Sequence, residues 1–157
     1  MNRKNRENGI LLPLFSLPGN YGIGTLGKNA YDFVDFLSSC KVDIWQLLPL
    51  NVTSYGDSPY QSPSSKGLNY YFIDLDTLVQ KGLLLKKDLK EATFSYDDRR
   101  VNYGLLFSKR IPILKKAFDH FNKNDSSFLS FEKEGEYRDF AFFMTMKERN
   151  HFSPWYQ

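Results

Sequence analysis

The chain has 157 residues, of which 41% are hydrophobic and 25% are charged, a composition that is typical of a globular domain and excludes a disordered chain. The formal net charge is only +3 and the cations are scattered, which argues against a nucleic-acid-binding surface. A single cysteine excludes an internal disulfide and suits the cytoplasm, and no apolar segment is long enough to span a membrane.

The first half of the chain predicts a strand, a helix and a second strand. Residues 9–12 form a short apolar run that ends at Pro13, and residues 44–48 form a second run, which we interpret as a buried strand. Residues 26–39 between them have helical periodicity, and Cys40 behind this helix is interpreted as a small core residue. The order predicts a βαβ unit with parallel strands and a right-handed crossover. The apolar helix face consists of Ala30, Phe33, Val34 and Leu37.

Two long loops, residues 13–24 and 49–69, are expected to leave the same end of these strands. In α/β folds, ligands bind at the carboxyl ends of parallel strands. The second loop carries Tyr55 and Tyr60 among Ser, Asp and Gln side chains, and Gly and Pro stiffen its backbone. Aromatic faces beside polar groups suit a sugar ring. Packing within the loop is an equal alternative for either tyrosine taken singly.

The second half predicts mainly helices. Residues 70–75 are rich in β-forming side chains and predict a short strand or extended segment. Pro112 predicts a kink in the longest helix. Two or three parallel strands followed by helices leave the edges and faces of the sheet uncovered, so the sequence predicts the beginning of a larger α/β fold with a helical insertion. The predicted helical segments are 78–81, 86–92, 103–122, 127–134 and 136–149.

The other motifs in the sequence give weaker evidence for a functional site. Residues 22–27 read G-x-G-x-x-G but lie about nine residues beyond the first strand, so we interpret them as a turn that sets a helix start, not as a dinucleotide site. His120 and His151 lack further ligands at suitable spacing, which predicts no metal site. Asp57 alone cannot perform glycosidase chemistry, which needs two carboxylates. Local loop structure with some substrate contact is therefore favoured for Asp57, and a helix cap for Asp74.

Two blocks of the sequence are highly specific. One joins Gly9-Ile10-Leu11-Leu12-Pro13 with Tyr21-Gly22-Ile23-Gly24, and the other joins Trp45-Gln46-Leu47-Leu48-Pro49-Leu50 with Tyr55-Gly56-Asp57-Ser58-Pro59-Tyr60-Gln61-Ser62. Ile73-Asp74-Leu75 follows, and weaker matches extend to the final Pro154-Trp155. These blocks resemble the start of the 4-alpha-glucanotransferases, the amylomaltases or disproportionating enzymes of glycoside hydrolase family seventy-seven.

That resemblance implies an α/β fold with a TIM (β/α)8 barrel. Residues 1–76 would form its first βα units with the substrate loop 49–69, and residues 77–157 a mostly helical inserted subdomain, truncated here, so that the barrel is incomplete. It implies transfer of α-1,4-glucan segments to glucose or another glucan by a retaining mechanism, without a metal or organic cofactor. The nucleophilic Asp and the acid/base Glu of the family match no position here. They are expected in a missing carboxy-terminal part, and this chain alone is expected to be inactive.

The resemblance also implies the substrate contacts. Tyr60 would stack on the sugar beside the scissile bond, and Tyr55 matches a secondary glucan contact. The partners would be an α-1,4-glucan or maltooligosaccharide and the missing part of the barrel, in the cytoplasm, with no nucleic acid and no membrane. The alternative is a non-catalytic glucan-binding or interaction module, which would have to be stable on its own. The expected substrate-binding residues are Tyr60, Ser58, Asp57, Gln61, Asn69 and Tyr55.

Overall fold

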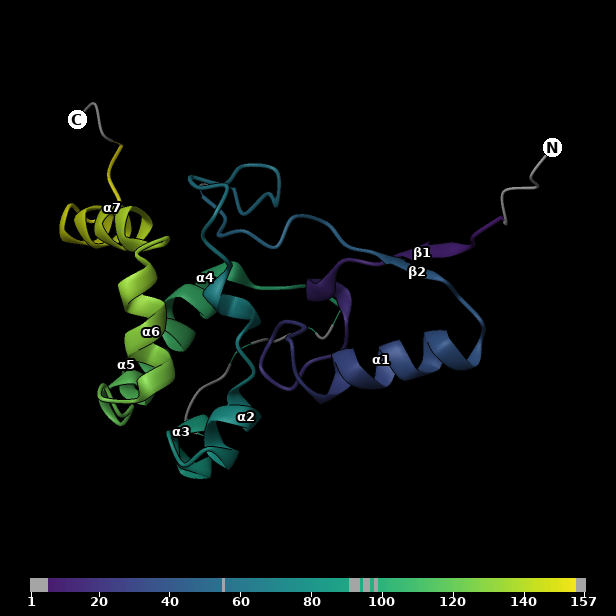
Figure 1. Cartoon of the computed structure of the whole chain (residues 1–157), viewed down its shortest axis with the longest axis horizontal. Helices are drawn as coiled ribbons and strands as arrows, with labels where there is room; N and C mark the ends of the chain where they lie inside the picture. Colours follow the sequence, from purple (N-terminus) through teal and green to yellow (C-terminus); the bar gives the residue numbers. More distant parts are fainter. Residues whose placement is uncertain (1–5, 55, 91–93, 95–96, 98, 155–157) are drawn as a thin grey trace.

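The computed structural model describes residues 6–54, 56–90, 94, 97 and 99–154. Strands β1 (Gly9–Leu11) and β2 (Ile44–Gln46) form a parallel pair, and helix α1 (Lys28–Ser39) connects them (Figure 1). Gly9 is paired with Ile44, and Leu11 with Gln46. The predicted strand, helix and parallel strand are thus confirmed, although both strands are shorter than the apolar runs.

Short helices and helical turns make up most of the remaining regular secondary structure. Figure 1 shows α5, α6 and α7 at the end of the molecule opposite β1 and β2, with the loop that follows β2 between the two ends. These elements are the 3₁₀ turns η1 (Leu14–Ser16) and η2 (Tyr70–Phe72), the π-helical turn η3 (Leu106–Arg110), and the helices α2 (Leu75–Gln80), α3 (Lys86–Lys90), α4 (Tyr103–Leu105), α5 (Ile111–Asp119), α6 (Ser126–Glu134) and α7 (Arg138–Arg149).

The predicted strand over residues 70–75 is wrong, because two side-chain caps turn this segment into helix. Asn69 Oδ1 accepts a hydrogen bond from Tyr71 N at 2.9 Å and starts η2. Asp74 Oδ1 accepts one from Thr77 N at 2.7 Å and starts α2, which confirms the predicted cap. Such caps satisfy the free N–H groups of a first helical turn and here override the β preference of the aromatic side chains.

The predicted long helix exists, with an irregular turn inside it. Helical backbone extends from Tyr103 to Asp119, but η3 has π-helical geometry immediately before Pro112. Proline has no N–H to donate to the carbonyl of Ser108, and its ring would clash with that carbonyl in a regular α-helix. The wider π turn removes this conflict. The irregularity predicted at Pro112 therefore takes the form of a π-helical turn.

One hydrophobic core joins the loop after β1, the segment after β2 and the helical region. Fully burying a large apolar side chain contributes about 1.5–3 kcal/mol, so this cluster fixes how the three parts lie against one another. Its buried members are Leu14, Leu17, Ile23, Ala30, Tyr71, Phe72, Leu75, Leu84, Leu89, Phe94, Leu106, Ile113 and Ala117.

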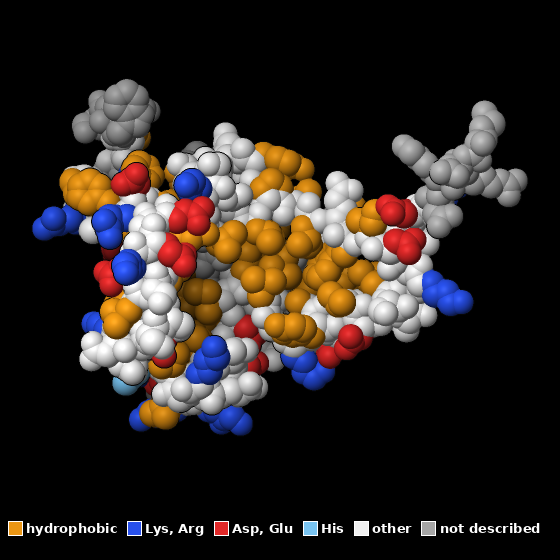
Figure 2. Space-filling model, in the orientation of Figure 1, with side chains coloured by type: hydrophobic (Ala, Val, Ile, Leu, Met, Phe, Trp, Pro, Cys, Tyr) orange, Lys and Arg blue, Asp and Glu red, His pale blue; other side chains and the backbone are white. Residues whose placement is uncertain are grey.

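The sheet end of the molecule has an uncovered apolar surface. The prediction that residues 44–48 form a buried strand is wrong, since Ile44 is 46% exposed, and Leu11 on the paired strand is 54% exposed. Val34 and Cys40, both expected in the core, are also exposed. Figure 2 shows hydrophobic side chains gathered between the strands and α1. A pair of strands with one helix has no second layer to cover these groups. This agrees with the prediction that the faces of so small a sheet are uncovered.

Candidate functional site

The stems of the loop after β2 are hydrogen-bonded to each other. Val52 N donates to Gly67 O at 2.9 Å, and Asn69 N donates to Leu50 O at 2.8 Å. The side chain of Val52 is buried, which anchors the outgoing stem in the molecule. The loop is therefore closed at its base, and the two hydrogen-bonded stems hold its tip in place.

The tip of this loop is folded by two residues with left-handed backbone. Gly56 has φ +87° and Asp57 has φ +54°, values that glycine adopts freely and that aspartate tolerates better than most residues. Asp57 N donates to Ser54 O at 3.0 Å, and Ser54 N donates to Gln61 O at 3.0 Å. Gln61 N closes a second turn by donating to Ser58 O at 3.0 Å. The local sequence thus dictates a compact double turn.

This turn brings four of the expected contact residues together. Tyr60 projects from it with 72% of its surface exposed, and Tyr60 N donates to Ser58 Oγ at 3.3 Å. Asp57 is half-buried and Oδ1 accepts a bond from Thr53 Oγ1 at 3.5 Å. Burial raises the pKa of Asp57, and the bond from Thr53 opposes that rise. Gln61 is exposed beside them. A flat aromatic face therefore stands next to hydroxyl, carboxyl and amide groups.

Asn69, another expected contact, is not part of this tip. Asn69 is buried at the base of the loop, where its carbonyl oxygen holds Tyr71 N. This bond ties the base of the loop to Tyr71. The Tyr71 ring in turn packs against Tyr70, with centroids 4.9 Å apart, and lies 6.4 Å from Tyr103. Tyr55 lies outside the residues that the structure describes.

The loop base also packs against α7. A Cβ atom added at Gly67 would lie 2.2 Å from Cζ of Phe140, so the backbone and the ring are in close contact. Lys66 Nζ lies 3.9 Å from Glu136 Oε1, but both side chains are exposed and such a pair contributes little. Glycine at this position allows the helical region to support the loop.

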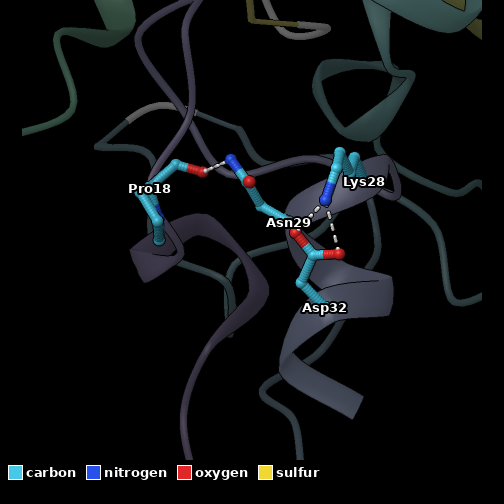
Figure 3. A network of polar contacts seen from close by, with 4 residues as sticks. All are labelled: Pro18, Lys28, Asn29 and Asp32. Atoms are coloured by element: carbon cyan, nitrogen blue, oxygen red, sulfur yellow. Dashed lines mark hydrogen bonds and ion pairs between the residues drawn. The ribbon is translucent and has the colours of Figure 1, made fainter. Parts of the chain in front are cut away.

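The loop after β1 is fixed against α1 and η2. Gly24 N donates to Phe15 O at 3.3 Å, and Leu26 N donates to Phe72 O at 2.9 Å. Asn29 Nδ2 at the start of α1 donates to Pro18 O at 2.7 Å, and Figure 3 shows the two residues pointing toward each other. The neighbouring Lys28 pairs with Asp32 one turn further along the helix (Figure 3).

A cleft of about 1020 Å³ separates this loop from the segment before α4, and an adjoining cleft of about 460 Å³ reaches Asp57. Arg100 and Tyr103 line both clefts, as does Asp97, which is paired with Arg99 Nε at 3.2 Å. These residues were not among the predicted contacts. Tyr103 has the periodicity of a helix face, and only the tertiary structure places it opposite the loop tip.

The described side chains of the loop tip can bind a ligand by ring stacking and hydrogen bonds. Among all the residues that the structure describes, no three His, Cys, Asp or Glu residues are grouped closely enough to hold a metal ion. Tyr60 can stack on an apolar ring face, and Asp57, Ser58 and Gln61 can exchange hydrogen bonds with hydroxyl groups. Within the same part of the chain, no helix has the length and apolar character needed to cross a membrane.

Comparison with known proteins gives consistent matches. Residues 12–157 match the family model described as 4-alpha-glucanotransferase. The chain is 49% identical over 143 residues to the 4-alpha-glucanotransferase of Clostridium butyricum, covering 89% of this chain and 29% of that protein. It is 41% identical over 157 residues to the Thermus thermophilus 4-alpha-glucanotransferase, covering 96% of this chain and 30% of that one.

A solved structure agrees with these sequence matches. The amylomaltase from Streptococcus agalactiae in complex with acarbose superposes with a TM-score of 0.86 at 45% identity, covering 92% of this chain and 30% of that chain. The chain therefore shares the fold of part of that enzyme and spans about 30% of the length of the relatives it matches. It belongs to the 4-alpha-glucanotransferase family, glycoside hydrolase family 77.

Proposed function

We propose that the chain forms one wall of the sugar-binding site of a 4-alpha-glucanotransferase, an enzyme that transfers segments of α-1,4-glucans by a retaining mechanism. The observation that carries this proposal is the loop tip, where an exposed Tyr60 ring is held beside Asp57, Ser58 and Gln61 on a closed base. Family membership and the acarbose complex of the related amylomaltase support it.

Each residue of the tip has a distinct role in the proposal. Tyr60 stacks on the ring of the sugar beside the bond that is broken, because a pyranose presents apolar C–H groups on its faces. Asp57, Ser58 and Gln61 bond to its hydroxyl groups. Asn69 supports the loop through Tyr71 N, and Tyr55 makes a secondary glucan contact. The nucleophilic Asp and the acid/base Glu lie in a part of the enzyme that this chain does not contain.

The proposed architecture places this chain at the start of a larger fold. Residues 1–76 form the first βα units of a TIM barrel with the substrate loop 49–69, and residues 77–157 belong to an inserted helical subdomain. The exposed apolar side chains of β1, β2 and α1 support this arrangement, because an uncovered face of this kind suits a core completed by further strands (Figure 2). The partner for that face is the remaining part of the barrel, in a cytoplasmic enzyme.

Sugar binding is tested by titrating the chain with acarbose. Tyr60→Ala removes the stacking surface, so we expect its affinity to fall about tenfold, while Tyr60→Phe keeps most of it. Tyr31→Ala is the matched control, because Tyr31 is similarly exposed, at 71%, but lies on α1 away from the tip. Equal losses for Tyr60→Ala and Tyr31→Ala would contradict the assigned contact.

Catalysis is tested with maltotriose. We expect the pure chain to release no glucose and no longer maltodextrins, because a retaining transfer needs two suitably spaced carboxylic acids. Co-expression with the complementary part of the 49% identical Clostridium butyricum enzyme should yield a complex that disproportionates maltotriose. Steady turnover by the pure chain, or failure of the two parts to co-purify, contradicts the proposed division of the enzyme.

A further inference from the structure

Arg110 connects three separate parts of the chain from a fully buried position. It ends the π-helical turn η3 and has 0% exposed surface. Arg110 Nη1 donates to Tyr21 O at 3.3 Å in the loop after β1, and Nη2 donates to Ile73 O at 2.5 Å just before α2. The positions of the two acceptors are 89 and 37 residues away in sequence, so this one guanidinium group holds distant segments together.

Side chains of the two clamped segments reinforce the same junction. Tyr21 Oη donates to Asp76 Oδ1 at 2.6 Å, and Thr25 Oγ1 donates to Asp74 Oδ2 at 2.8 Å. Burial, together with the bond to Asp76, raises the pKa of Tyr21 to about 12, so the hydroxyl stays protonated and donates at neutral pH. The loop after β1 is thereby tied to α2, and Arg110 adds the helical region to this junction.

A role in stability alone does not account for a charged residue here. Burial lowers the pKa of Arg110 to about 10, so the group remains charged at neutral pH and its desolvation is only partly offset. Within the described part of the chain, its buried Nε has no hydrogen-bond partner. Buried ionic groups are often replaceable by apolar side chains without loss of stability. The planar guanidinium fork instead supplies fixed geometry, because it aims two donors at two carbonyl groups at once.

The junction joins the elements that form the two walls of the cleft described above. Tyr103, which lines both clefts, is seven positions before Arg110 on the same helical run from Tyr103 to Asp119. Tyr21 belongs to the loop that forms the opposite wall, between lining residues Asn20 and Gly22. A clamp between Arg110 and Tyr21 O therefore fixes the distance between the two walls.

We propose that Arg110 is a positioning residue that sets the width of this cleft by locking the helical run that carries Tyr103 to the loop after β1. The proposal rests on the proposed function only for its ligand, a maltooligosaccharide. Arg110 does not line the cleft and acts through the elements that do. Its loss opens the cleft by releasing the loop after β1 while the helices α6 and α7 keep their structure.

Peptide-resolved hydrogen exchange on the chain tests this proposal, with Arg110→Lys keeping the charge and Arg110→Met keeping the aliphatic stem. In both variants we expect exchange of the Gly24 and Leu106 amides, bonded to Phe15 O and Asn102 O in the wild type, to rise about tenfold or more. Exchange in α6 and α7 should stay unchanged. A uniform rise along the chain indicates a merely structural role and overturns the proposal, as does an unchanged loop.

Two further measurements keep the test decisive. If neither variant folds, native-state exchange of the wild type in low denaturant must show Gly24 and Leu106 opening with one common free energy; independent opening overturns the proposal. Acarbose titration of folded variants should show about tenfold weaker binding than the wild type. Absence of acarbose binding by the wild-type chain contradicts the proposed function and leaves the exchange result to decide the role of Arg110.

Discussion

Replacing Asp74 by alanine is expected to destabilise the junction between the loop after β1 and α2. The carboxylate accepts hydrogen bonds from Thr77 N at 2.7 Å, from Thr77 Oγ1 at 2.8 Å and from Thr25 Oγ1 at 2.8 Å. Loss of an N-cap costs about 1 kcal/mol, and a hydrogen bond to a charged acceptor contributes roughly 1.5–3 kcal/mol. Both threonine hydroxyls can turn towards other partners, so we expect a total loss of about 3 kcal/mol.

Asp74→Asn removes the negative charge but keeps a side-chain oxygen that can cap the helix. The amide oxygen can still accept from Thr77 N, so this variant should lose only about 1 kcal/mol at neutral pH. Burial raises the pKa of Asp74, but the hydrogen bonds from Thr77 and Thr25 together lower it by a larger amount. The net pKa therefore lies below the ordinary value of 3.8. The stability contributed by the charge is therefore present above pH 3.8 and is lost as the pH falls through the folded-state pKa.

Urea unfolding followed by circular dichroism measures both effects. The free energies of unfolding of the wild type, Asp74→Ala and Asp74→Asn are compared at neutral pH and again at about pH 3. The gap between the wild type and Asp74→Asn should shrink at the lower pH. An Asp74→Ala variant within about 0.5 kcal/mol of the wild type, or a gap that does not change with pH, would refute the assigned role of the carboxylate.

Two further substitutions test the support and the tip of the substrate loop. Gly67→Ala should cost about 1–3 kcal/mol, because its Cβ would lie 2.2 Å from Cζ of Phe140; in a Phe140→Ala background the same change should cost little in urea unfolding, and an equal cost would contradict the contact. Asp57→Asn should be more stable than the wild type at pH 7, because burial raises the pKa of Asp57 and the charged form is destabilised above that pKa. The advantage should diminish as the pH falls and Asp57 becomes protonated, and an advantage that is independent of pH in the same assay would refute this explanation.

The sequence by itself determined much of the local structure, although helical turns occupy residues 70–75, where a strand was predicted. Apolar runs, helical periodicity and the cap at Asp74 located β1, β2, α1 and the later helices, because these signals depend on near neighbours along the chain. The Gly56-Asp57 pair likewise specifies the turn at the loop tip, since left-handed backbone favours these residue types. The two specific blocks predicted the family, which the family model confirms.

Only the tertiary structure decided which distant groups meet. The exposure of Ile44 and Cys40 depends on whether a further layer covers the sheet, which no local pattern records. The placement of Tyr103 opposite the loop tip and the clamp of Arg110 on Tyr21 O join segments that are far apart in sequence. Their physical basis is the packing of one shared core, which fixes positions across the fold after local preferences have formed the individual elements.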